Sequence, residues 1–237
     1  MSRTEWTEVK GHAMSTPDGR VRVANGLRMV DLCCGAGGAA MGYYLAGFEV
    51  TGVDIAPQPR YPFTFVQADA LTFPLDGFDA VHASPPCQAW TLAQRIRRND
   101  HPDLITPIRA RVSAAVVPYV IENVPGAPLH APVTLCGTMF GGLRVYRHRE
   151  FETSFPLTAP AHAAHPAPLA KMGRPPRPGE FVHVVGNFSG AAYARQAMGI
   201  AWMTRDELRE AIPPAYTRHV GHTLAALLHG AAAGWVA

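Results

Sequence analysis

Residues 29–38 are Met-Val-Asp-Leu-Cys-Cys-Gly-Ala-Gly-Gly, and this stretch decides the fold. Its first part, 29–33, indicates a short buried strand, and the glycines that follow let the backbone turn sharply and approach a ligand closely. Residues 39–45 then indicate a helix that Gly47 is placed to end. A glycine-rich turn between a strand and a helix aims backbone N–H groups at a ligand, so the unit suggests an adenosine-containing cofactor.

Strand-like and helical segments alternate along the next part of the chain. Segments 49–54, 63–69, 78–83 and 119–123 indicate strands, and Thr106 with Pro107 forms an N-cap and first-turn pair for a helix through Val116. Such alternation predicts an α/β protein with a doubly wound, mostly parallel sheet. In these sheets ligands bind at the carboxyl ends of the strands.

The C-terminal part begins with an irregular segment. Seven prolines between 156 and 178 predict a loop-rich insert, and order returns at 181–185. Thr204 and Glu207 form a capping box for a short helix, and a last helix is expected after Thr217. Its apolar stripe comprises Val220, Leu224, Leu227 and Leu228.

Composition narrows the class of protein. The 237 residues are 48% hydrophobic and 16% charged, which suits one globular α/β domain with a small appendage. No apolar run approaches the ~20 residues of a membrane span, and residues 1–10 lack a signal core. The four cysteines show no CxxC spacing and two are adjacent, which argues against a zinc site and a disulfide framework. We therefore expect a cytoplasmic monomer without a bound metal.

Positive charge is concentrated in one segment. Residues 89–111 hold five arginines against two aspartates, which accounts for the whole formal charge of +3. A cluster of arginines is often only a solvated face, but one placed directly after residues 84–88 suggests that a polyanion is brought there.

Residues 84–88, Ser-Pro-Pro-Cys-Gln, place a thiol in a stiff turn after the strand-like segment 78–83. Each proline fixes its own φ and biases the preceding residue toward extended backbone. Cys87 is therefore held in place, as a nucleophile would be. A lone cysteine in such a loop is more often a packing residue, so the interpretation depends on the other motifs.

Two carboxylates follow the second and third strands. Asp54 could accept hydrogen bonds from ribose hydroxyls, and Asp69 could meet an adenine amino group. An acid at a strand end is most often a turn former, but a glycine loop and two acids, one at each strand end, form a more specific pattern.

Taken in order, these motifs resemble those of the DNA (cytosine-5) methyltransferases of bacteria and their phages. The resemblance spans about residues 29–151, with a weaker echo at 212–214. The resemblance rests on residues 31–38, Asp54, Asp69, 84–88, Glu122-Asn123-Val124 and Arg147-His148-Arg149. It implies a Rossmann-like class I methyltransferase fold, S-adenosylmethionine as cofactor and double-stranded DNA with a flipped cytosine as partner.

The resemblance also implies the chemistry. In the family, the thiolate at the Cys87 position adds to carbon 6 of cytosine, and carbon 5 then takes the methyl group. Glu122 would hold ring nitrogen 3, Arg149 would bind the oxygen at carbon 2, Arg147 would support Arg149, and Asn123 would orient the loops. The plainer interpretations are a surface ion pair for Arg149 and a cap or salt bridge for Glu122.

Binding residues are implied in the same way. Those for the cofactor are Asp31, Cys33, Gly35, Ala36, Gly37, Gly38, Asp54, Ile55, Asp69, Ala70 and Pro85. Those for the nucleic acid are Gln88, Arg95, Arg97 and Arg98, on a loop that would close over the flipped base.

The sequence departs from the family in three places. The region between the arginine motif and the last motif is short and Pro-rich, Val145 replaces an expected glutamine, and Glu210-Ala211 replaces an expected Gly-Asn. We therefore divide the chain into an N-terminal extension (1–26), a catalytic domain (27–151 with 198–237) and a short target-recognition segment (152–197). The cofactor-side role of the C-terminal part is left open by these changes.

Other functions remain compatible with the sequence. A methyltransferase for RNA or a free pyrimidine nucleotide would need the same nucleophile, and the short recognition segment favours it. A noncatalytic DNA-binding relic of the fold is the alternative from another class, against which Cys87 and Glu122 argue. An amino-group methyltransferase would need an aromatic residue where Cys87 stands, and Trp90 lies three positions later.

Overall fold

The computed structural model describes residues 23–87, 90, 103–165, 167–171, 174 and 176–233. Seven strands form one sheet in the order β3-β2-β1-β4-β5-β7-β6. The strands are β1 (Arg28–Leu32), β2 (Glu49–Asp54), β3 (Thr64–Gln67), β4 (Ala80–Ala83), β5 (Tyr119–Asn123), β6 (Val133–Leu135) and β7 (Arg149–Thr153). The helices are α1 (Gly38–Leu45), α3 (Ile105–Ala114), the 3-10 helix η2 (Gly137–Met139), α4 (Ala191–Met198), α5 (Arg205–Glu210) and α6 (Pro214–Ala233).

The sheet is mostly parallel. The pairs β1–β2, β2–β3, β1–β4 and β4–β5 are parallel, whereas β7 runs antiparallel to both β5 and β6. The chain moves outward from β1 to β3 and then returns to the centre at β4, so the strand order reverses beside β1. The predicted α/β class and doubly wound sheet are confirmed, and the reversal predicts a ligand crevice at the carboxyl ends of β1 and β4.

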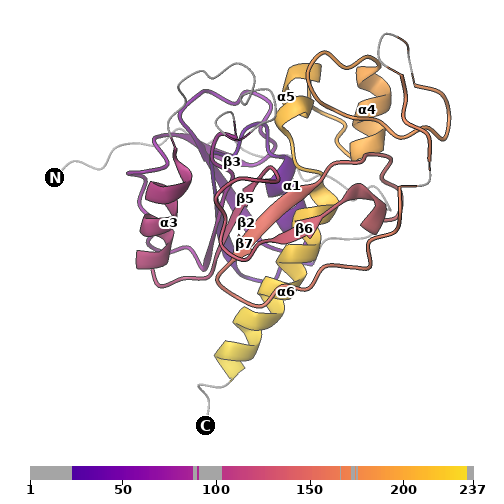
Figure 1. Cartoon of the computed structure of the whole chain (residues 1–237). Coiled ribbons are helices and arrows are strands. Elements are labelled where there is room, and N and C mark those ends of the chain that lie inside the picture. The colour runs from indigo at the N-terminus through magenta and orange to yellow at the C-terminus, as the bar shows by residue number, and fades with distance from the viewer. Residues whose placement is uncertain are drawn as a thin grey trace.

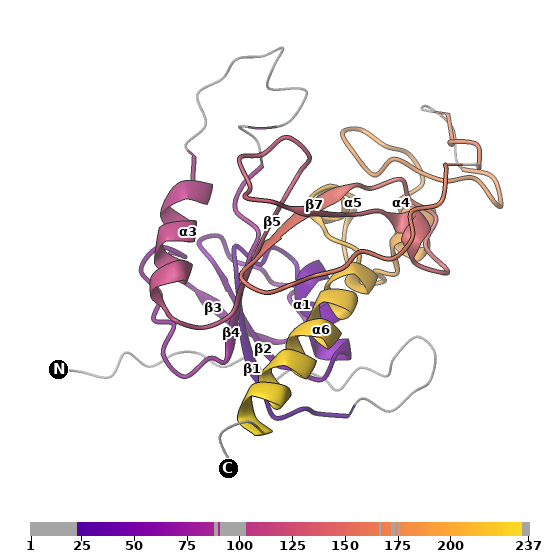
Figure 2. The same cartoon turned by 60° about the horizontal axis from the view of Figure 1, so that its bottom comes forward.

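Helices cover both faces of the sheet. Helices α1 and α6 lie together on one face and α3 lies on the other (Figure 1, Figure 2). The approach of α1 to α6 is close because Gly42 has no side chain: a Cβ atom there would lie 2.0 Å from Thr217 Oγ1. Thr217 Oγ1 also donates to the carbonyl of Ala39 at 2.8 Å. This contact joins the helix after the glycine loop to the C-terminal helix.

A separate hydrophobic cluster lies beside the sheet. It packs α4 and α5 against the irregular chain around Val145 and Val182, which pair through an isolated parallel bridge. Leu169 and Phe181 form a second such bridge. Ala36 of the glycine loop belongs to this cluster, so the irregular part packs directly on the predicted cofactor loop.

Three sequence expectations about helix ends are wrong. Helix α3 is not capped by Thr106, because Asp103 Oδ1 accepts from the Ile105 amide at 2.8 Å and the helix starts one residue before Thr106. It ends at Ala114, and Val116 is 93% exposed with a left-handed φ of 58°. Helix α6 begins at Pro214 rather than after Thr217, since proline suits a first helical turn.

The predicted core stripe of α6 is correct in its first half. Val220 and Leu224 are fully buried, and Leu228 is partly buried against the core. Leu227 is 42% exposed, which contradicts its place in the stripe. The helix extends past the edge of the sheet (Figure 2), where there is less core to cover it. The capping box at Thr204 and Glu207 is confirmed, with Thr204 Oγ1 accepting from the Glu207 amide.

None of the helices within the described ranges is both long enough and apolar enough to span a membrane.

Candidate active site

A cavity of about 370 Å³ lies at the carboxyl ends of the parallel strands. Most of the predicted site residues line it: Cys33, Gly35, Ala36, Gly38, Asp54, Ile55, Asp69, Ala70, Pro85, Cys87, Glu122, Asn123 and Arg149. Asp31, Gly37 and Arg147 are not among the lining residues. Gln88, Arg95, Arg97 and Arg98 lie outside the described residues.

The glycine-rich turn forms one end of this cavity. Cys33, Gly35 and Gly37 all have left-handed φ values, of 55°, 49° and 84°. Such a φ costs a non-glycine residue about 1–2 kcal/mol, so Cys33 carries backbone strain that the surrounding contacts must hold. The Cys34 amide donates to the carbonyl of Val53 at 3.1 Å, which ties the turn to β2.

Asp54 and Asp69 lie at this same end. Asp54 accepts from the Gly35 amide through Oδ2 at 3.0 Å and from the Ala56 amide through Oδ1 at 2.9 Å. Asp69 Oδ1 accepts from the Leu71 amide at 2.8 Å. Both carboxylates therefore form turns, as the plainer interpretation predicted. Each oxygen can accept more than one hydrogen bond, so turn formation leaves capacity for a ligand in the cavity.

Asp31 lies below the turn rather than in the cavity. Its side chain is fully buried, and the Ala40 amide, the one backbone group of the described residues that lowers its pKa, makes no hydrogen bond of ordinary geometry to either carboxylate oxygen. Burial, together with the charges of Asp54 and Glu122, raises the pKa of Asp31 well above its usual range. A protonated Asp31 is the form that this environment favours.

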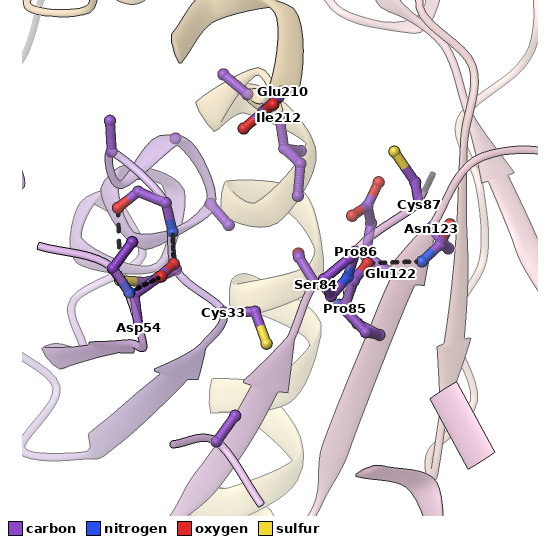
Figure 3. A pocket seen from close by; sticks show the side chains of 18 of the residues that line it. Cys33, Asp54, Ser84, Pro85, Pro86, Cys87, Glu122, Asn123, Glu210 and Ile212 are labelled. Carbon is purple, nitrogen blue, oxygen red and sulfur yellow. Dashed lines mark hydrogen bonds between the residues drawn. The ribbon is translucent and has the colours of Figure 1, made fainter. Parts of the chain in front are cut away.

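Cys87 lies at the opposite end, beside Glu122 (Figure 3). The turn that carries it is anchored by Asn123, whose Nδ2 donates to the carbonyl of Pro85 at 2.9 Å. Asn123 Oδ1 in turn accepts from the Val124 amide at 2.9 Å. Because Asn123 ends β5, the Pro-Pro turn after β4 is held against the neighbouring strand.

Glu122 and Arg149 form a buried ion pair. Arg149 Nε lies 3.0 Å from Glu122 Oε1, and the two side chains are only 11% and 6% exposed. Glu122 is the second-last residue of β5 and Arg149 begins β7, so the antiparallel pairing of these strands brings the charges together. Glu122 Oε1 has no hydrogen-bond partner among the described residues, so the Arg149 contact is electrostatic and this oxygen retains its acceptor capacity.

Arg147 lies behind this pair. Its Nη1 donates to the carbonyl of Val184 at 2.7 Å and its Nη2 donates to the carbonyl of Arg209 at 2.6 Å. Burial, followed by repulsion from Arg149, lowers the pKa of Arg147 to about 9. Arg147 thus connects the start of β7 to the irregular segment and to α5.

Burial shifts the protonation of Cys87 and Glu122. It raises the pKa of the Cys87 thiol above its ordinary 9.0, against the opposing effect of Arg149, and Glu122 raises it further. Burial also raises the pKa of Glu122, although Arg149 and a hydrogen bond from Ser84 lower it. At neutral pH Cys87 is therefore mainly a thiol.

A buried polar chain leads from the core to Glu122. Tyr43 Oη lies 2.9 Å from His82 Nδ1, and His82 Nε2 lies 2.9 Å from Ser84 Oγ. Burial lowers the pKa of His82 to about 3, so the imidazole is neutral and bonds as donor on one side and acceptor on the other. The sequence analysis gave no role to His82 or to Ser84, although Ser84 belongs to the motif at residues 84–88 and His82 lies in the strand before it.

The C-terminal part supplies one wall of the cavity. The sequence analysis had left the role of this part open. Met203, Glu207, Glu210, Ala211 and Ile212 all line it. Figure 3 shows Glu210 and Ile212 facing the space between Asp54 and Cys87. Contact with the glycine loop is tight, because a Cβ atom on Gly38 would lie 2.5 Å from the Ile212 carbonyl oxygen. The weak motif at 212–214 was the only signal of this wall in the sequence.

No protein-family model matches the chain, and no curated protein sequence matches it. Solved structures do match at the level of the fold. A structure assigned as a DNA modification methyltransferase encoded within an E. coli prophage matches with a TM-score of 0.64 and 14% identity, covering 86% of this chain and 100% of that one.

Two eukaryotic structures show the same similarity. The S. pombe Dnmt2 methyltransferase matches with a TM-score of 0.54 and 13% identity, over 86% of this chain and 99% of that one. An Entamoeba histolytica methyltransferase, EhMeth, matches with a TM-score of 0.57 and 10% identity, over 85% of this chain and 98% of that one. The resemblance expected from the motifs is thus confirmed for the fold: the chain has the Rossmann-like fold of these methyltransferase structures.

Proposed function

We propose that the protein is an S-adenosylmethionine-dependent methyltransferase that modifies carbon 5 of a cytosine in DNA. One observation carries the proposal: Cys87, Glu122 and Arg149 line the same cavity as the glycine-rich turn, Asp54 and Asp69. One end of the cavity holds a nucleophile with a buried carboxyl–guanidinium pair, and the other end holds a nucleotide-type turn. This arrangement suits the transfer of a group between two bound molecules.

The residues at the cofactor end fit S-adenosylmethionine. The cavity, about 370 Å³, falls within the range of about 300–1,000 Å³ typical of small-molecule sites. A Cβ atom on Gly35 would meet no atom of the described residues within 4 Å, so the turn leaves open space beside its backbone. Asp54 would hold the ribose and Asp69 the adenine amino group. The bound cofactor supplies an electrophilic methyl group.

The residues at the other end fit a cytosine ring. The Cys87 thiolate would add to carbon 6, which makes carbon 5 nucleophilic enough to take the methyl group. Loss of the proton from carbon 5 then re-forms the double bond and expels the thiolate. Glu122 suits ring nitrogen 3 because its raised pKa favours a protonated carboxyl that can donate there. Arg149 would bind the oxygen at carbon 2.

DNA as the partner rests on the order of the motifs and on the charged segment. Carbon 6 of a paired cytosine is inaccessible, so the base would have to be flipped into the cavity. Arg95, Arg97 and Arg98 would contact phosphate, with Gln88 beside the target base. Residues 152–197 would read the sequence around it, residues 27–151 with 198–237 would form the catalytic part, and 1–26 would be an extension.

The test is methyl transfer from labelled S-adenosylmethionine to DNA, RNA and deoxycytidine nucleotides, with the Cys87→Ala variant beside the wild-type chain. We expect label in duplex DNA from the wild-type chain and none from the variant, which should still bind the cofactor. Label only in RNA or nucleotides would correct the substrate and retain the nucleophile. Cofactor binding without transfer to any substrate would contradict the enzymatic proposal and favour a noncatalytic binding protein.

A covalent trap tests the nucleophile directly. DNA containing 5-fluorocytosine should form a stable complex with the wild-type chain, because fluorine cannot leave carbon 5 as a proton does. Mass spectrometry of the digested complex should place the adduct on Cys87. An adduct on Cys33 or Cys34 would contradict the assigned role.

A further inference from the structure

One group of metal-binding side chains lies outside the proposed active site. Cys136, His148, His162 and His165 place their ligand atoms within 4.8 Å of one another. They come from three separate segments: the residue before η2, the residue before β7, and the Pro-rich chain after β7. Cysteine spacing alone predicted no zinc site, but three of these four ligands are histidines.

Two of the ligand-to-ligand distances match those of a four-coordinate site. Cys136 Sγ lies 3.4 Å from His165 Nε2, and His162 Nε2 lies 3.2 Å from His165 Nε2. Tetrahedral zinc with bonds of about 2.0–2.3 Å separates two nitrogen ligands by about 3.3 Å and a sulfur from a nitrogen by about 3.6 Å. The distances from His165 to Cys136 and to His162 are therefore close to those between two ligands of one zinc ion.

Aromatic packing is the plainer explanation for part of the cluster. Tyr146 stacks on His165 with ring centroids 4.1 Å apart, and the rings of His148 and His165 are 5.0 Å apart. Stacking accounts for where the His165 ring lies. It does not explain why the ligand atoms of all four side chains lie within 4.8 Å of one another, which metal coordination does. Hydrogen bonds join His165 to Cys136 and to His162, but no hydrogen bond among the described residues joins His148 to this group.

Surrounding contacts orient the ligands. Thr138 Oγ1 donates to Cys136 Sγ at 3.5 Å. The Tyr146 hydroxyl donates to the Ala167 carbonyl at 2.8 Å and accepts from the Ala167 amide at 2.9 Å, which fixes the chain two residues after His165. Hydrogen bonds around the first ligands are typical of established metal sites.

The ligand set selects the metal. A thiolate with three imidazoles suits zinc, whereas magnesium and calcium require oxygen ligands. Cys136 is buried and His148 is half-buried, whereas His162 and His165 are exposed, so an ion can enter from solvent.

We propose that Cys136, His148, His162 and His165 bind one Zn²⁺ ion in a closed structural site. Four protein ligands leave no open position, so the ion would serve folding rather than chemistry. His148 lies between Arg147 and Arg149, and β7 begins at Arg149. The ion would therefore fasten the Pro-rich segment to the strand that positions the guanidinium of the active-site ion pair.

Metal content of the full chain tests this directly. The protein is stripped with a chelator under reducing conditions and titrated with Zn²⁺ against a competing indicator. We expect about one equivalent to bind and the melting temperature to rise. With Co²⁺ we expect the intense visible bands of a tetrahedral site and a sulfur-to-cobalt charge-transfer band.

Two histidine variants provide the matched comparison. His165→Ala should lose the bound equivalent of Zn²⁺ and the Co²⁺ bands. His183→Ala is the control, because His183 is an exposed histidine beside Tyr146 that lies outside the four-residue group. Since His165 and His183 are both exposed, each variant should fold. Cys136→Ser should remove the charge-transfer band while tetrahedral bands weaken.

Three results would overturn the proposal. These are Zn²⁺ binding weaker than micromolar in the wild-type chain, an octahedral Co²⁺ spectrum without a sulfur band, and equal loss of metal from His183→Ala and His165→Ala. None of these readouts depends on methyl transfer, so the metal site stands or fails independently of the proposed activity.

Discussion

The two ends of the cavity are built differently. At the glycine-rich end, Asp54 and Asp69 hydrogen-bond amides within or beside their own loops, and nearby sequence supplies most of the contacts. At the Cys87 end, Glu122 and Arg149 come from strands 27 positions apart in sequence and meet as a buried pair. Turn-forming carboxylates tolerate the loss of one hydrogen bond, whereas breaking a buried ion pair leaves an uncompensated charge. We therefore expect substitutions at the glycine-rich end to have moderate effects on binding and activity, and substitutions at the Cys87 end to have large ones.

The largest effect is expected from Glu122→Gln. The amide keeps the shape of the side chain but has no proton to donate as an acid, and it leaves Arg149 without a partner charge. We expect the rate constant of the methyl-transfer step to fall by roughly 10²–10³-fold, the size of a lost charge-stabilising group. Single-turnover transfer to DNA measures it, and Glu150→Gln, on the same strand as Arg149, is the control. A change below about threefold would show that the two ends do not differ as proposed.

Gly42→Ala should disturb the α1–α6 contact behind the glycine-rich end. The new Cβ atom would lie 2.0 Å from Thr217 Oγ1, so we expect the free energy of unfolding to fall by about 1–3 kcal/mol. Gly230→Ala in α6 is the matched control, because its Cβ atom would meet nothing of the described residues within 4 Å. There helix propensity should stabilise by about 0.5–1 kcal/mol. Denaturant unfolding of both variants would reveal whether the signs are opposite.

Asp54→Asn tests the glycine-rich end. Asn retains one acceptor oxygen but loses the charge, so we expect the Kd for S-adenosylmethionine to rise by roughly 10–30-fold. The rate of transfer at saturating cofactor should change by less than about threefold, because Asp54 does not touch the cytosine end. Calorimetry and saturation kinetics separate these effects, with Asp76→Asn on an exposed loop as control. A large fall in saturated rate with unchanged affinity would contradict a binding role.

The smallest effects are expected in the pH dependence of Cys87 alkylation. The raised pKa means that less thiolate is present at any given pH, so the rate with iodoacetamide should reach half its maximum above pH 9.0. Glu122→Gln removes a charge that raises the pKa and should shift this midpoint down, whereas Arg149→Ala should shift it up. Peptide mapping distinguishes Cys87 from Cys33, whose pKa is raised to about 12 by burial and the neighbouring carboxylates. Shifts of the same sign in both variants would contradict this electrostatic arrangement.

Local sequence was sufficient where neighbouring residues determine the structure. The strand, glycine turn and helix of residues 29–45, and the capping box at Thr204, depend on backbone preferences and hydrogen bonds a few residues apart. The helix starts at Thr106 and Thr217 were predicted wrongly because Asp103, which accepts from the Ile105 amide, and Pro214, which suits a first helical turn, were equally good local signals. Local patterns therefore identified the elements better than their boundaries.

The sequence by itself determined the five parallel strands, the glycine-rich turn, and which side chains stand at the ends of those strands. These follow from periodicity and backbone chemistry, which act over a few residues. Strands β6 and β7 and helix α4 were not among the predictions from the sequence. Only the tertiary structure decided that Arg149 pairs with Glu122 while Arg147 turns toward Val184 and Arg209, and that residues 203–212 close the cavity. It also brought Cys136 to three distant histidines. The physical reason is that burial and charge pairing depend on which surfaces meet, and strand pairing and packing decide that across the whole chain.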